Sequence, residues 1–122
     1  MSDDFKEYKV FLEIISVDGF CSHNHKVGEK FEVSLSEPGK LCGHFYNAVY
    51  PWITTFQFGG NICFSLFQGN DKDTYNVHCP DAKNMVTARM TREFKKVWEK
   101  EKIERAVAAA RRKREAKKKE GK

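Results

Sequence analysis

The sequence lacks any long apolar run, and no stretch approaches the ~20 apolar residues that a membrane-spanning helix requires. It begins MSDDFKEYKV, an acidic segment without an apolar signal core, so we expect no export signal and a cytoplasmic, reducing location. The four cysteines form no C-x-x-C pair, which argues against an ordinary zinc knuckle and a thioredoxin-type redox motif. In such a compartment the thiols are expected to be reduced or metal-bound rather than joined in disulfides.

Charge is divided unevenly along the 122 residues. Up to Thr91 the chain has 8 Lys and Arg against 11 Asp and Glu, whereas from Arg92 onward it has 14 against 6. The second part contains no Gly or Pro before Gly121 and is dominated by strong helix formers. The sequence therefore predicts a core domain at 1–91 and a basic helix at 92–122. The first turns of this helix are expected to dock through Phe94 and Trp98, and the rest to project into solvent.

The first part of the chain alternates apolar and polar residues in several short segments. This pattern, with many β-branched and aromatic residues, predicts strands at 8–17, 30–35, 74–79 and 85–90, the last two forming a hairpin. A short helix is predicted at 41–50, and 62–67 is interpreted as a strand or an irregular apolar loop. The predicted fold class is α+β, with a small twisted, mostly antiparallel sheet of four or five strands, one short internal helix and a long basic C-terminal helix.

Cysteine and histidine gather in the stretch FCSHNHKVGEKF, which contains Cys21, His23 and His25. Cys42 is expected at a helix start and Cys79 at a strand end, and sites are commonly built where elements end. If Cys21, Cys42 and Cys79 converge with a histidine such as His25, the donor set suits zinc or iron. The alternatives are a reactive thiol, and three cysteines that serve only as small buried apolar residues.

Cys42 also supports a catalytic hypothesis. A helix N-terminus favours a thiolate there, and His23 or His25 from the preceding loop is the candidate base for nucleophilic or acid–base chemistry. The opposing interpretation is a Cys42 side chain that is turned inward and inert. The sequence does not decide whether the protein is an enzyme.

Aromatic residues are concentrated after Cys42, and they suggest a pocket for a planar apolar ligand beside the thiols. The predicted binding residues are Tyr46, Trp52, Phe58, Gly59 and Gly60. The simpler interpretation is that this aromatic density forms the hydrophobic core.

Four elements occur in an order that resembles a family of small, functionally uncharacterised bacterial and archaeal proteins, often from anaerobes. They are Cys21 followed by KVGEKF (26–31), GKLCGHFYNAVYP (39–51), Phe58-Gly59-Gly60, and Cys79-Pro80-Asp81. The family usually has Pro-Trp after the Gly pair, where this chain has Cys63-Phe64, and the basic helix lies outside the family core. The resemblance implies an α+β domain and three recurrent thiols, Cys21, Cys42 and Cys79, but no activity.

The basic run RRKREAKKK (111–119) has no interleaved aromatic residues and no base-reading pattern. Nucleic acid is therefore disfavoured, and we expect either a protein partner or self-association through the C-terminal helix, with no membrane contact. Three hypotheses follow for the whole chain. They are a metal- or thiol-site protein, a small enzyme or enzyme subunit with a Cys–His pair, and an adaptor that docks through its basic helix.

Overall fold

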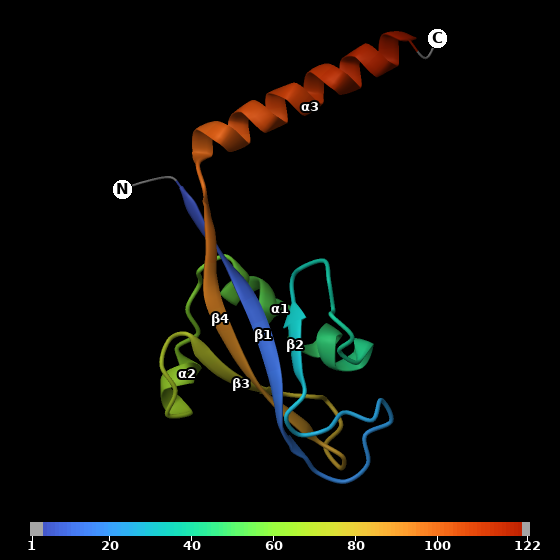
Figure 1. Cartoon of the computed structure of the whole chain (residues 1–122), viewed down its shortest axis with the longest axis vertical. Coiled ribbons are helices and arrows are strands. Elements are labelled where there is room, and N and C mark those ends of the chain that lie inside the picture. Colours follow the sequence, from blue (N-terminus) through green and yellow to red (C-terminus); the bar gives the residue numbers. More distant parts are fainter. Residues whose placement is uncertain (1–3, 121–122) are drawn as a thin grey trace.

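The computed structural model describes residues 4–120, which form an antiparallel sheet with strand order β2-β1-β4-β3 (Figure 1). The two central strands, β1 (Phe5–Val17) and β4 (Val86–Trp98), pair from Phe5–Trp98 to Val17–Val86. The flanking strands β2 (Lys30–Val33) and β3 (Thr74–His78) are short. The predicted α+β class and the hairpin of the last two strands are both confirmed.

Helix α1 (Gly43–Gln57) covers one face of this sheet. Its residues Phe45, Val49, Ile53 and Phe56 recur at helical spacing and are all buried. The predicted helix at 41–50 was too short, because α1 continues through Pro51. A proline in a helix interior costs ~3 kcal/mol, but burying two more large side chains, Ile53 and Phe56, contributes ~3–6 kcal/mol. Packing against the sheet therefore outweighs the local preference for a break.

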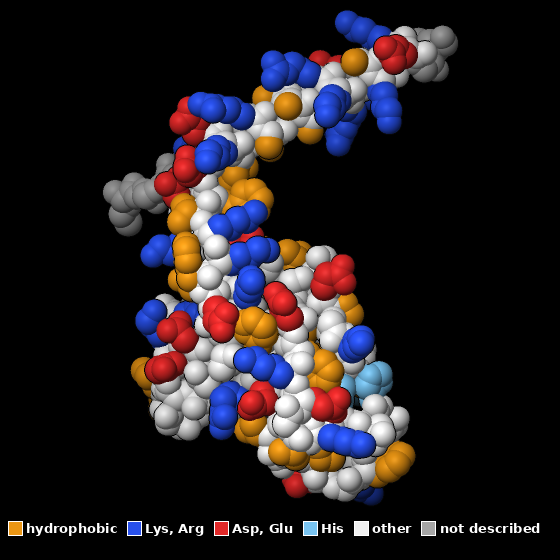
Figure 2. All heavy atoms as spheres, in the orientation of Figure 1, with side chains coloured by type: hydrophobic (Ala, Val, Ile, Leu, Met, Phe, Trp, Pro, Cys, Tyr) orange, Lys and Arg blue, Asp and Glu red, His pale blue; other side chains and the backbone are white. Residues whose placement is uncertain are grey.

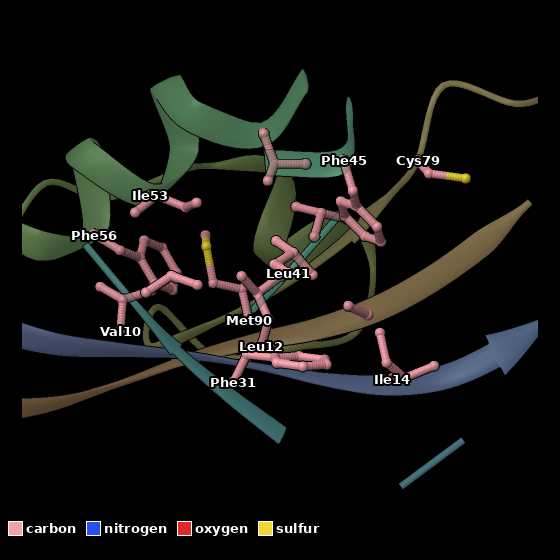
Figure 3. Close-up of a cluster of buried hydrophobic side chains, with 14 of the residues drawn as sticks. Val10, Leu12, Ile14, Phe31, Leu41, Phe45, Ile53, Phe56, Cys79 and Met90 are labelled. Atoms are coloured by element: carbon pink, nitrogen blue, oxygen red, sulfur yellow. The ribbon is translucent and has the colours of Figure 1, made fainter. Parts of the chain in front are cut away.

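The core lies between α1 and the inner face of the sheet (Figure 3). Its fully buried large side chains come from both layers and include Leu12, Ile14, Phe45, Ile53, Phe56 and Met90. Cys79 lies at the end of the core that holds Phe45 and Ile14, opposite the end that holds Phe56 (Figure 3). The core therefore places one cysteine at its margin, near the start of α1.

The predicted helix start at Arg92 is wrong, and the boundary predicted between 91 and 92 falls within a strand. Strand β4 continues to Trp98, and α3 (Lys100–Glu120) begins only at Lys100. Residues 93–98 have good helix propensity, but they pair with the first part of β1, and this long-range backbone pairing prevails over propensity. Phe94 and Trp98 therefore lie on a strand and dock no helix.

Two further elements complete the description. Residues 62–67, expected as a strand or an irregular loop, contain the short helix α2 (Phe64–Phe67). Within residues 4–120, none of the helices combines the length and apolar character needed to cross a bilayer.

Candidate functional site: a pocket lined by three cysteines

Cys21, Cys42 and Cys79 line one pocket of about 90 Å³. Each comes from a different segment: the β1–β2 loop, the N-cap of α1, and the position directly after β3. Other residues that line it are Phe20, His25, His44, Phe45, Asp81 and Val86. Three cysteines that are distant in sequence therefore line a common space.

The sheet register explains this convergence. Val17 at the end of β1 pairs with Val86 at the start of β4, and β3 also runs antiparallel to β4. The loops that follow β1 and β3 therefore leave the same end of the sheet. A backbone hydrogen bond from the N–H of Asp18 to the carbonyl of Met85 then holds the two loops together, and one from the N–H of Cys79 to the carbonyl of Val86 closes the hairpin of β3 and β4. The N-terminus of α1 closes the pocket from above the sheet, where Phe45 is the first buried residue of the helix.

Each of the three cysteines lies beside backbone N–H groups or a helix N-terminus. The N–H of His25 donates to Cys21 Sγ at 3.5 Å, and the N–H of Val86 donates to Cys79 Sγ at 3.1 Å. Cys42 precedes the first turn of the 15-residue α1 and makes no side-chain capping bond. N–H donors and helix N-termini both stabilise electron-rich sulfur. All four cysteines of the chain are free thiols in the structure.

His25 is buried, and its role differs from the predicted one. Its Nε2 accepts a hydrogen bond from the backbone N–H of Cys42 at 3.1 Å, and its ring packs edge-on against Phe31. The nitrogen that would serve as a base or as a metal ligand is therefore already engaged by the backbone. His25 fastens the β1–β2 loop to the start of α1, which positions both Cys21 and Cys42.

The pKa of His25 lies below its ordinary value of 6.5, mainly because burial disfavours the imidazolium, with the charge of His23 acting in the same direction and Glu29 opposing both. The unfolded chain therefore binds more protons than the folded chain just below pH 6.5. We expect the free energy of unfolding to be highest above pH 6.5 and to fall as the pH is lowered from 6.5 toward the folded-state pKa.

Denaturant titrations between pH 7.5 and 5, in buffer with chelator, test this pH dependence. In His25→Gln the decline of stability through this range should be smaller than in the parent chain. The matched control is His78→Gln, which replaces an exposed histidine on β3, and it should keep the parental slope. An unchanged slope in His25→Gln would show that another group causes the loss.

The remaining histidines lie in different positions. His23 is exposed beside His25, with ring centroids 4.7 Å apart, and is not among the residues that line the pocket. His78 lines a separate hollow between β3 and α1. His44, two residues after Cys42 on α1, lines the thiol pocket. The structure thus brings His44, rather than His23, to the cysteines.

The predicted aromatic pocket is not assembled beside the thiols. Phe58, Gly59 and Gly60 follow the C-terminus of α1, roughly 24 Å along the helix axis from Cys42 at 1.5 Å per residue. The prediction failed because the helix runs on through Pro51 and carries these residues to the far end of the core.

The two remaining members of that predicted set are also engaged elsewhere. The hydroxyl of Tyr46 donates to the carbonyl of Ser34 at 2.7 Å, and the ring of Trp52 packs edge-on against Tyr75. Trp52 lines the hollow beside β3 rather than the thiol pocket. Both side chains therefore support the packing of α1 against neighbouring segments.

The cysteines share the pocket without forming a ready-made coordination cage. Among the residues that the structure describes, no group of three or more His, Cys, Asp and Glu side chains is arranged to hold a metal ion. Cys63, the N-cap of α2, is exposed and lies outside the set of pocket-lining residues.

Comparisons of the chain with protein-family models, with curated proteins and with solved structures find no match. The family resemblance inferred from the sequence motifs stays a prediction.

Proposed function

We propose that this chain is a thiol-site protein that binds a soft metal ion, with zinc as the first candidate and iron as the second, through Cys21, Cys42 and Cys79. The observation that supports the proposal is the meeting of these three cysteines, from three separate segments, at one pocket. Thiolate ligands select zinc, iron and other soft ions over the hard cations magnesium and calcium.

The surroundings of the sulfur atoms suit such an ion. Backbone N–H groups beside Cys21 and Cys79, and the N-terminus of α1 beside Cys42, offset part of the negative charge of three thiolates. His44, which lines the same pocket, is the proposed fourth ligand in place of His25. Because no group of three or more such side chains is already arranged to hold a metal ion among residues 4–120, binding requires the segments that carry the three sulfur atoms to draw together, since zinc–sulfur bonds are about 2.3 Å long.

A cytoplasmic, reducing location is part of this proposal, because it keeps the three thiols free to coordinate. The Cys–His enzyme is less well supported. The contact between His25 and Cys42 joins the imidazole to a backbone N–H and not to the thiol, so the structure offers Cys42 no positioned base there.

Metal analysis of protein purified without added metal, followed by titration with Zn²⁺ and Co²⁺, tests the proposal. We expect one equivalent of metal per chain and a thiolate-to-cobalt absorption band with Co²⁺. Cys21→Ser, Cys42→Ser and Cys79→Ser should each weaken binding, by roughly tenfold or more.

Cys63→Ser is the matched control, since it removes an exposed cysteine outside the pocket, and it should bind as the parent chain does. Equal binding by all four variants, or no binding by the parent, would contradict the proposal.

A further inference from the structure

The outer edges of β2 and β3 are both closed by the chain itself. Beside β3, the side-chain amide of Gln68 accepts from the N–H of Asn76 at 2.8 Å and donates to the Asn76 carbonyl at 2.9 Å, as a neighbouring strand would. Beside β2, Gly39 comes so near to Glu32 that a Cβ on this glycine would collide with the Glu32 carbonyl oxygen. Native sheets block such edges because unpaired backbone groups bind other chains.

One stretch of edge stays open, and it belongs to β1. Strand β2 pairs with β1 only from Val10 onward, because the chain turns away at Ser34, whose N–H donates to the carbonyl of Glu37. Figure 1 shows β1 running on past the end of β2. In the described part of the chain, residues 5–9 therefore have β4 on one side and no strand on the other.

The backbone of Tyr8 faces this open side. The N–H of Ile14 donates to the carbonyl of Glu29, and the Ile14 carbonyl accepts from the N–H of Gly28, so the backbone groups of Ile14 point toward β2. These groups alternate in direction along a strand, and the register of β1 is unbroken from Tyr8 to Ile14. The N–H and carbonyl of Tyr8 therefore point the same way, and no hydrogen bond within residues 4–120 reaches them there.

A groove of about 440 Å³ lies along this open edge. Its lining includes residues 7–9 of β1, the end of β2 with the following turn, and Gln57 at the end of α1. Gln57 is only 6% exposed, and its Oε1 accepts from the N–H of Leu35 at 2.7 Å, whereas its Nε2 makes no hydrogen bond among the described residues. This nitrogen is therefore a donor available to a carbonyl oxygen in the groove.

The charges around the groove are mixed. Its charged lining residues are Glu7, Glu32, Glu37, Lys9 and Lys95. Figure 2 shows both acidic and basic side chains in the region where β1 and β4 extend beyond the body. Such a lining attracts neither a polyanion nor a polycation strongly. The features that distinguish this groove are thus the open backbone of β1 and the amide of Gln57.

We propose that the edge of β1 at Tyr8 binds an extended peptide segment of another protein, which continues the line of β2. The peptide bonds to the N–H and carbonyl of Tyr8, as an added strand does at other open sheet edges. Its residue opposite Tyr8 is uncharged, because that side chain lies on the α1 face of the sheet, beside the buried Gln57. Gln57 Nε2 donates to a carbonyl oxygen of the peptide.

This interaction does not depend on metal binding. The groove shares no lining residue with the pocket of Cys21, Cys42 and Cys79. Failure of the peptide site would therefore leave the proposed metal site untouched, and the reverse also holds.

Selection from a display library of random linear peptides, followed by calorimetry with the peptides obtained, tests the site. Only alternate N–H groups of an added strand face β1. We therefore expect N-methylation of every second peptide residue to weaken binding by roughly tenfold or more, with little effect at the residues between.

Amide hydrogen exchange locates the bound peptide on the protein. The N–H of Tyr8 should exchange fast in the free chain and slowly with peptide. The N–H of Lys9, which pairs with Glu93 on β4, should be protected in both states. Protection of Tyr8 that rises with protein concentration in the absence of peptide would instead identify a second copy as the occupant and overturn the proposal.

Gln57→Glu tests the amide donor, because it keeps an oxygen for the N–H of Leu35 but removes Nε2. Peptide binding should weaken by roughly tenfold. The charge-matched control, Ala82→Glu in the exposed turn between β3 and β4, should bind as the parent does. A library without binders, binders that leave the exchange of Tyr8 unchanged, N-methylation without a two-residue period, or equal binding by both variants would also overturn the proposal.

Discussion

Replacement of Arg92 by alanine is expected to lower the free energy of unfolding by about 2–4 kcal/mol. The side chain is only 2% exposed and donates to Asp73 at 2.8 Å, to the carbonyl of Gly60 at 2.6 Å and to Asn61 at 2.9 Å. Its guanidinium also lies against the rings of Tyr8 and Phe56. Truncation would leave these acceptors without their donor and open a space between the two rings.

The loss of stability stays within this range because Asp73 is half exposed and can be rehydrated. Arg92→Lys should retain part of the stability, since it keeps the charge but not the planar set of donors. Arg89→Ala, on the exposed face of the same strand, is the control and should change stability by no more than about 0.5 kcal/mol. Urea titration compares the variants, and equal losses for Arg92→Ala and Arg89→Ala would refute the assigned role.

Zinc is expected to raise the free energy of unfolding by about 2.7 kcal/mol at a free concentration roughly 100 times its dissociation constant. The proposed ligands belong to the β1–β2 loop, the start of α1 and the segment after β3, so one ion would join three parts of the fold. Metal affinity for the unfolded chain would reduce the effect. Thermal or urea unfolding with chelator and with buffered zinc measures the difference.

Matched variants separate this effect from general salt stabilisation. Cys79→Ser should lose the zinc-dependent gain, while Cys63→Ser should keep it, because Cys63 lies outside the pocket. Magnesium should have no comparable effect, since it prefers oxygen ligands. A zinc-dependent gain of the same size in both cysteine variants would place the ion elsewhere on the chain.

Local pattern was sufficient to predict much of the sheet. The alternation of Phe31 and Val33 with polar neighbours placed β2, and a Pro-Asp turn between two apolar segments placed the β3–β4 hairpin. The predictions failed where distant contacts decide the conformation. Residues 93–98 favour a helix by propensity but are held as a strand by β1, and α1 passes through Pro51 because its apolar face continues.

The candidate site was predictable in its residues but not in its geometry. Cys42 is the N-cap of α1, Cys79 directly follows β3 and Cys21 lies in the loop after β1, and the sheet register brings these segments to one end of the sheet. The bond between His25 Nε2 and the backbone of Cys42 depends on the path of the β1–β2 loop, which turns through a positive φ of 61° at Asn24 and 96° at Gly28. The spacing of residues along the chain does not specify the path of this loop. The sequence alone therefore indicated His25 as a metal ligand or a base.

X-ray absorption at the zinc edge of the zinc-loaded protein tests directly whether the three cysteines bind one ion, because it counts the sulfur atoms around the metal. We expect three sulfur ligands at about 2.3 Å in the parent chain and in Cys63→Ser, and fewer in Cys42→Ser. A zinc ion surrounded only by nitrogen and oxygen at about 2.0–2.1 Å would contradict it.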